Sequence, residues 1–186
     1  MCFDWLETIC GSLIFVIFIL IYVFRIVNVD GESMQNTLQN HDKLFIWEWY
    51  YTPKNGDVVV ISEGKELKLP LAKRVIAIEN QKLDINFSIG EVKVNGSKLN
   101  EVYIKEPMIR PRYTAKDRNG VYKVILMEDI HIIVPIGYNF VMGDNRNNSD
   151  DSRFPYISLI KNEHIIGRVK GRLWPVGSIG KIRSLV

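Results

Sequence analysis

The N-terminal part of the chain contains a long uncharged apolar run. Residues 11–24 hold no Asp, Glu, Lys or Arg, and apolar residues continue beyond Arg25. A helix needs ~20 residues to cross the hydrocarbon core of a bilayer, and 10–29 reaches this length if Arg25 extends its charge towards the interface. The run predicts a transmembrane anchor at 10–29, between a short N-terminal segment, 1–9, and a domain, 30–186.

A cleaved secretory signal is the alternative, because the apolar core is short. No Lys or Arg precedes the run, and no pair of small residues at small-x-small spacing follows it closely, so we favour an uncleaved anchor. The orientation is weakly encoded. Arg25 follows the run, and by the positive-inside rule this charge places the C-terminal domain in the cytoplasm.

Composition limits the remaining possibilities. A chain of 186 residues supports one modest domain plus an appendage. Its formal net charge of +3 suits an anionic lipid surface and is too diffuse to indicate nucleic acid as a partner. Cys2 and Cys10 both lie before or at the start of the run, so no disulfide framework is expected.

The domain reads as a series of short strands. Runs of β-forming residues are separated by turn formers, and Asn95-Gly96 is a two-residue hairpin signal. The expected strands are 43–51, 58–61, 69–78, 82–85, 91–94, 132–134, 138–142 and 165–172. The pattern weakens over 100–130, which we expect to form an excursion or flap outside the main sheet. With little helix, the spacing predicts an all-β barrel or sandwich.

Chemistry centres on Ser33, which follows the apolar run within residues 30–38. A free serine is a poor nucleophile and needs a base. The three histidines lack a recognisable setting, Gly31 to Gln35 is not the G-x-S-x-G elbow, and no ligand spacing predicts a metal site. A dyad with Lys73, which lies among aliphatic residues, is what remains.

Lys73 can act as a base only when it is neutral. An exposed lysine titrates at ~10.4, and burial can lower this pKa by ~3 to 5 units. Leu69, Leu71, Val75 and Ile76 supply apolar neighbours. Strand alternation nevertheless lets Lys73 face either the core or solvent, so local sequence leaves both interpretations open.

A polar run at 143–153 is the third notable stretch. Asp, Asn, Ser and Gly are ordinary loop residues, and a solvated turn is the default interpretation. The acids Asp144 and Asp151 and the bases Arg146 and Arg153 allow a second one, a loop locked by ion pairs beside the dyad. In that case Ser149 is placed to orient the Lys73 amine.

Together these stretches resemble the type I signal peptidases, membrane-anchored Ser-Lys endopeptidases that remove signal peptides from exported preproteins. Four motifs occur in the family's order, and the single anchor and compact length resemble Gram-positive members. The motifs are Ser33-Met34-x-x-Thr37-Leu38, Gly56-Asp57-Val58-Val59-Val60, Lys73-Arg74-Val75-Ile76, and Gly143-Asp144-Asn145-Arg146-x-x-Ser149-x-Asp151-Ser152-Arg153.

The resemblance implies a mainly antiparallel β domain with Ser33 as nucleophile and Lys73 as general base. It implies that Ser149 orients the lysine, that Asp151 with Arg74 and Arg153 holds the site by ion pairs, and that backbone amides, the Ser33 N–H among them, bind the oxyanion. The substrate is expected to add as a strand and to be cut after a small-x-small site. The implied substrate-binding residues are Asp30, Gly31, Glu32, Met34, Leu69, Pro70, Leu71 and Ala72.

The resemblance also implies partners and location. We expect a monomer that contacts preprotein signal peptides and the bilayer, without cofactor, metal or nucleic acid. The family's catalytic domain lies outside the cytoplasm, and we follow the resemblance here over the single charge of Arg25. Asn36 stands where the family has proline, so a degenerate paralogue that binds signal sequences or pilin-like substrates without cleaving them stays open. The anchor, and the lack of a helix-turn-helix before Ser33, argue against a self-cleaving repressor.

Overall fold

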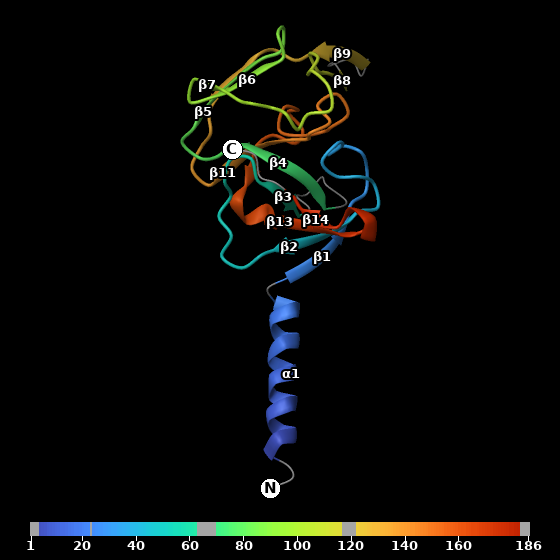
Figure 1. Ribbon diagram of the computed structural model, residues 1–186. Coiled ribbons are helices and arrows are strands. Elements are labelled where there is room, and N and C mark those ends of the chain that lie inside the picture. Colours follow the sequence, from blue (N-terminus) through green and yellow to red (C-terminus); the bar gives the residue numbers. More distant parts are fainter. Residues whose placement is uncertain (1–3, 23, 63–69, 117–121, 183–186) are drawn as a thin grey trace.

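The computed structural model describes residues 4–22, 24–62, 70–116 and 122–182 (Figure 1). Helix α1 (Asp4–Tyr22) projects away from the β domain, and every side chain from Trp5 to Phe18 is exposed. Among the helices in those ranges, none reaches the combination of length and apolar character that crossing a bilayer requires.

The C-terminal part of the predicted anchor is a strand. Residues Phe24–Asn28 form β1, and Ile26 and Val27 align with Phe45 and Leu44 of the antiparallel strand β2 (Lys43–Trp47). β-branched residues favour extended structure, and β2 supplies their backbone hydrogen bonds. The predicted helical span 10–29 is therefore wrong at its C-terminal boundary, and the helix also begins earlier, at Asp4.

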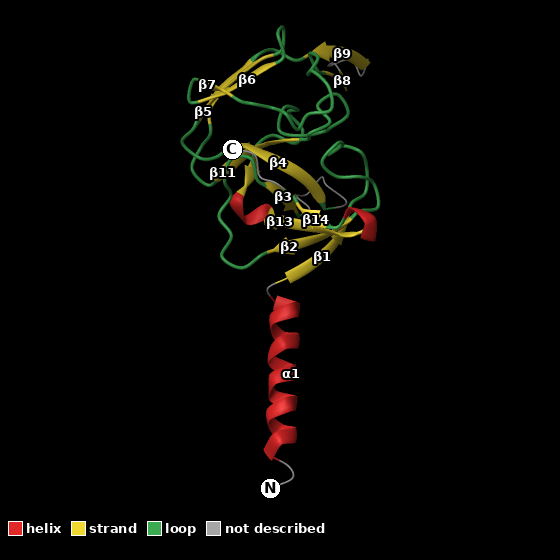
Figure 2. Ribbon diagram, in the orientation of Figure 1, coloured by secondary structure: helices red, strands yellow, loops and turns green. Residues whose placement is uncertain are grey.

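An open antiparallel sheet of eight strands forms the body of the domain. Its order is β1-β2-β13-β3-β4-β11-β12, with β14 paired to β13. The further strands are β3 (Val58–Ile61), β4 (Leu71–Ala77), β11 (Tyr138–Met142), β12 (Ile160–Lys161), β13 (Ile165–Trp174) and β14 (Gly180–Lys181). Figure 2 shows strands and loops through the domain, with short helical turns at η1 (Asn162–His164) and η2 (Val176–Ser178). The prediction of a mainly antiparallel β domain is confirmed.

A second, four-stranded sheet has the order β10-β5-β6-β7. Its strands are β5 (Lys82–Asn86), β6 (Glu91–Val94), β7 (Ser97–Lys98) and β10 (Ile130–Ile133). The predicted hairpin turn is confirmed, since Asn95 and Gly96 join β6 to β7 with φ of 51° and 81°. Within the 100–130 region, β8 (Arg112–Lys116) and β9 (Tyr122–Leu126) form a separate two-stranded antiparallel sheet.

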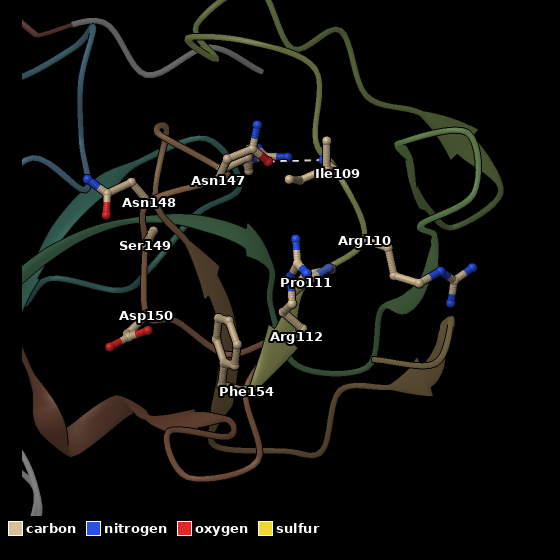
Figure 3. Close-up of a pocket in the computed structure, with 10 residues that line it drawn as sticks. Ile109, Arg110, Pro111, Arg112, Asn147, Asn148, Ser149, Asp150 and Phe154 are labelled. Carbon is tan, nitrogen blue, oxygen red and sulfur yellow. Dashed lines mark hydrogen bonds between the residues drawn. The ribbon is translucent and has the colours of Figure 1, made fainter. Parts of the chain in front are cut away.

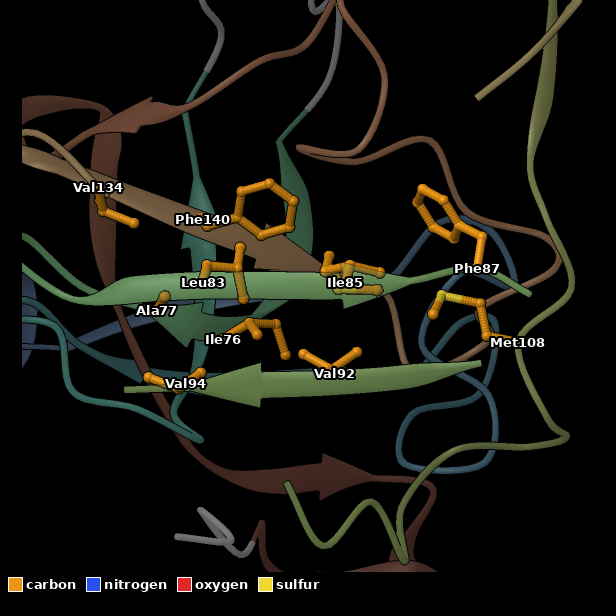
Figure 4. Close-up of a cluster of buried hydrophobic side chains, with 11 residues drawn as sticks. Ile76, Ala77, Leu83, Ile85, Phe87, Val92, Val94, Met108, Val134 and Phe140 are labelled. Atoms are coloured by element: carbon orange, nitrogen blue, oxygen red, sulfur yellow. The ribbon is translucent and has the colours of Figure 1, made fainter. Parts of the chain in front are cut away.

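A buried hydrophobic cluster joins the two sheets (Figure 4). Ile76 of β4 and Phe140 of β11 pack with Leu83, Ile85 and Val92 of the second sheet. Each of these side chains is at most 3% exposed, so packing fixes their positions. The second sheet therefore braces β4 and β11, the strands that lead to Lys73 and to the 143–153 loop.

Candidate active site

The Ser33 segment, residues 30–38, crosses from β1 to β2. Gly31 has φ of 104°, a conformation that residues with a Cβ rarely adopt, and its N–H donates to Asn40 Oδ1 at 3.0 Å. Met34 and Leu38 are 2% and 0% exposed and pack in the core with strands β2 and β3. These two apolar side chains fix the segment and leave Ser33 half-buried at the surface.

Lys73 lies in the middle of β4, opposite Val59 of β3. Its side chain faces inward and is 3% exposed, which decides the question that strand alternation left open. Lys73 Nζ donates a hydrogen bond to Ser33 Oγ at 2.8 Å. The structure therefore brings together the two residues predicted as nucleophile and base.

The surroundings of Lys73 favour its neutral form. Burial lowers its pKa from 10.5 to about 8, although the carboxylates of Asp151, Asp150 and Asp144 act in the opposite direction. With this pKa, roughly a tenth of the amine is neutral at pH 7. A base of this kind is available near neutral pH without a metal or a histidine.

The 143–153 loop holds the Ser33 segment in place through Asn145. The Asn145 N–H donates to the Ser33 carbonyl oxygen at 3.0 Å, and Asn145 Nδ2 donates to the Glu32 carbonyl oxygen at 3.1 Å. Gly143 lies against the same segment, where a Cβ would overlap Ser149 Oγ and the Ser33 carbonyl oxygen. Close approach of the loop to Ser33 therefore requires glycine at position 143.

Asp151 is the hub of the loop. Its carboxylate accepts hydrogen bonds from Arg153 Nε at 2.8 Å, from Ser149 Oγ at 2.9 Å and from the Gly143 N–H at 2.9 Å. The expected pair of Asp151 with Arg153 is present and buried. A hydrogen bond from Ser149 to Lys73 is not among those of the described residues, so an orienting role for Ser149 stays a prediction.

The predicted partner of Arg74 is wrong. Arg74 Nε and Nη2 donate to the two carboxylate oxygens of Asp144, at 2.7 and 2.6 Å, instead of reaching Asp151. Neighbouring residues on a strand point to opposite faces, so Arg74 faces away from Lys73. There its guanidinium also donates to the Gly56 carbonyl oxygen and the Thr37 hydroxyl, while the Tyr103 ring centroid lies 4.1 Å from Arg74 Cζ.

Two cavities meet at Ser33. The dyad cavity, of about 530 Å³, is lined by Asp30, Gly31, Glu32, Ser33, Leu71, Lys73, Asn148, Ser149, Asp150, Tyr156 and Ile157. The small cavity, of about 20 Å³, is lined by Val27, Asn28, Val29, Asp30, Gly31, Ser33, Met34, Leu44, Val60, Pro70, Leu71 and Ala72. The predicted substrate-binding residues line one or both cavities, except Leu69, which lies outside the described residues.

Comparison with known proteins assigns this chain to a family. The model of the family described as signal peptidase, peptidase S26, matches residues 2–174. The chain belongs to the signal peptidase family. It is similar to signal peptidase I P of Bacillus subtilis subsp. natto, with 35% identity over 88% of this chain and 84% of that protein. It is also similar to signal peptidase I of Leptolyngbya laminosa, with 31% identity over 96% and 83% of the two chains.

A crystal structure of a signal peptidase I from Enterococcus faecalis V583 aligns with a TM-score of 0.46 and 23% identity, over 63% of this chain and 97% of that one. Membership of the signal peptidase family makes this chain a peptidase.

Sequence reasoning missed part of the site of this signal peptidase family member. It gave no role to Asn145, to the small size of Gly143, or to Tyr103 between two arginines. Asn145 and Gly143 lie inside the 143–153 motif, which marked them as candidate site residues. The motif did not indicate which residues they contact. Tyr103 lies in the 100–130 region, where the strand pattern is weak and offers no comparable signal.

Proposed function

We propose that this chain is a serine endopeptidase that cleaves signal peptides from preproteins with Ser33 as nucleophile and Lys73 as general base. The observation that carries the proposal is the 2.8 Å hydrogen bond between Lys73 Nζ and Ser33 Oγ within a cavity large enough for a peptide. A buried amine next to a hydroxyl is the arrangement that activates serine without histidine.

The residues support an acyl-enzyme sequence. Neutral Lys73 takes the proton of Ser33 as Oγ bonds to the substrate carbonyl carbon, and the resulting ammonium returns that proton to the amine that leaves when the C–N bond breaks. A water then hydrolyses the ester, with Lys73 again taking the proton. Among the described residues the Ser33 N–H has no hydrogen-bond partner, which leaves it available to the oxyanion.

The small cavity supports selection of small residues. About 20 Å³ is little more than the space needed to hold one water molecule, so a methyl group fits and a leucine side chain does not. Its apolar walls, among them Val29, Val60 and Ala72, suit an alanine side chain. This cavity supports a small residue before the cleaved bond, and the second small position of a small-x-small site comes from the family resemblance.

Membrane attachment through α1 is part of the proposal. Its exposed side chains include Trp5, Ile9, Leu13, Phe15 and Phe18, and contact with lipid would bury them. We place the β domain on the extracytoplasmic side of the cell membrane, where exported preproteins are processed. Fractionation of cells and protease accessibility of the domain in intact cells test this location.

Cleavage of a preprotein with a small-x-small site by the detergent-purified full chain tests the activity. We expect Ser33→Ala and Lys73→Ala each to lower kcat by at least ~10⁴-fold while the melting temperature stays near that of the parent. Ser97→Ala and Lys54→Ala, at exposed positions, are the matched controls. Retained cleavage in either dyad variant refutes the proposal, and capture of substrate without turnover by the parent chain favours the non-cleaving alternative.

A further inference from the structure

A third cavity adjoins the dyad cavity. This arginine cavity, of about 350 Å³, lies between residues 147–150 and residues 109–112 (Figure 3). Its lining is Ile109, Arg110, Pro111, Arg112, Arg146, Asn147, Asn148, Ser149, Asp150 and Phe154. Asn148, Ser149 and Asp150 line both cavities, so a peptide that leaves the dyad cavity over this strip enters the arginine cavity.

The walls of the arginine cavity are fixed to each other. Asn147 Oδ1 accepts a hydrogen bond from the Ile109 N–H at 2.9 Å (Figure 3). Asn147 Nδ2 donates to the Pro107 carbonyl oxygen at 3.1 Å. Phe154, 8% exposed, supplies an apolar surface. A site whose walls are joined in this way is formed before any ligand arrives.

The two cavities differ in charge. Asp30, Glu32 and Lys73 line the dyad cavity alone, whereas Arg110, Arg112 and Arg146 line the arginine cavity alone, and Asp150 lines both. Two of these arginines are engaged elsewhere. Arg110 binds Asp129 and Ser88 and points away from residues 148–150 in Figure 3, and Arg146 is buried against Glu101 at 2.5 Å.

Arg112 differs from the other two arginines. It is exposed at the start of β8, and in the described part of the chain its guanidinium has no ion-pair partner. Arg112 is therefore the cation of this cavity that a ligand can reach.

The arrangement of the three cavities indicates the direction in which a bound peptide runs. The small cavity and the arginine cavity share no described residue with each other, and each shares several with the dyad cavity. The dyad cavity therefore lies between them. Under the proposed function the small cavity takes the residue before the cleaved bond, so the chain after that bond leaves towards Arg112.

We propose that the arginine cavity binds the segment of the substrate that follows the cleaved bond, and that Arg112 favours an acidic side chain there. This inference rests on the proposed function, because that function decides which end of the peptide lies in the small cavity. Arg112 acts as a residue that determines specificity, through an ion pair with the substrate carboxylate.

Paired substrates test the inference. All peptides share the same signal segment and the same small-x-small site. In each peptide, one of positions two to six after the cleaved bond is either Asp or Lys, and kcat/KM is measured for each peptide with the full chain. An exposed ion pair predicts a preference for Asp of about two- to fivefold at one or two adjacent positions, and the preference should shrink at high salt. Arg112→Lys should retain it, and Arg112→Glu should reverse it.

Lys116→Glu is the matched control, since Lys116 lies on the same strand and does not line the cavity. Equal kcat/KM for the Asp and Lys peptides, or a preference unchanged in Arg112→Glu, overturns the inference while leaving cleavage intact. Fluorescence anisotropy of the same labelled peptides with the Ser33→Ala chain measures the charge preference without turnover. A failure of the proposed function therefore appears as absent cleavage, separately from the result for Arg112.

Discussion

Arg74 and Asp144 form a buried ion pair behind Lys73, with both guanidinium–carboxylate contacts at 2.7 Å or less. The Thr37 hydroxyl donates to the same carboxylate. The pair therefore joins β4, the 143–153 loop and the Ser33 segment at one point. Lys73 and Ser33 reach each other because these three parts of the chain are held together beneath them.

Loss of this pair should destabilise the domain. Asp144→Asn leaves the Arg74 guanidinium buried without its counter-charge, at a cost of ~3–5 kcal/mol. For a chain of this size the melting temperature should fall by roughly 6–20 °C. Glu163→Gln, which removes the exposed partner of Lys161, should leave the melting temperature nearly unchanged. An unchanged melting temperature in Asp144→Asn contradicts the prediction.

The pH dependence of cleavage should report the Lys73 amine. Its pKa of about 8 predicts that kcat/KM falls about tenfold per pH unit below that value, because the ammonium cannot accept the serine proton. Asp150 raises this pKa by stabilising the ammonium, so Asp150→Asn should lower it and move the acid limb to lower pH. Glu163→Gln is the control. An acid limb that stays in place or moves to higher pH opposes the assignment of Lys73 as base.

Gly143→Ala should impair catalysis more than folding. The added methyl group overlaps Ser149 Oγ and the Ser33 carbonyl oxygen, so the loop has to move away from the nucleophile. A displacement of about 1 Å can cost ~10²-fold in rate, and we expect a loss of kcat of that size. Gly177→Ala, at an open position, should cleave like the parent. Equal activity of the two variants argues against the close-approach requirement.

Tyr103 should matter for its ring more than for its hydroxyl. The ring lies against the Arg74 guanidinium, whereas the hydroxyl contacts with Arg146 and Glu101 are long, at 3.5 and 3.4 Å. Tyr103→Ala should lower the free energy of unfolding by ~3–5 kcal/mol, as aromatic truncations do, and Tyr103→Phe should cost much less. Denaturant titration of both variants measures this, and equal losses would contradict it.

The strand pattern predicted the domain well because antiparallel strands are short and bounded by turn formers. The face of Lys73 was harder to predict. β4 lies inside the sheet with both of its faces covered, so Lys73 and Arg74 are both buried, at 3% and 0% exposure. In such a strand, alternation no longer separates core residues from surface residues. Exclusion of histidine and metal chemistry, together with the resemblance, led to the dyad, and strand periodicity did not contribute.

The ion-pair partner of Arg74 could not be predicted from the sequence, because it depends on tertiary structure. The 143–153 motif offers two buried acids, and only the path of the loop decides that Asp144 faces Arg74 while Asp151 faces Arg153. The prediction of helix at the end of the apolar run failed for a related reason. Its last residues have apolar side chains that suit a bilayer and β-branched shapes that suit a strand, and pairing with β2 selected the strand.

A single residue separates α1 from β1, and β1 is hydrogen-bonded along its length to β2. Five residues after β1 ends, the chain reaches Ser33. Pairing with β2 fixes the path of β1, so the distance of the Ser33 hydroxyl from the start of β1 is nearly constant. Under the proposed attachment through α1, a cleavage site has to be presented at the level of Ser33, which makes its position relative to the membrane a second criterion of selection besides its sequence.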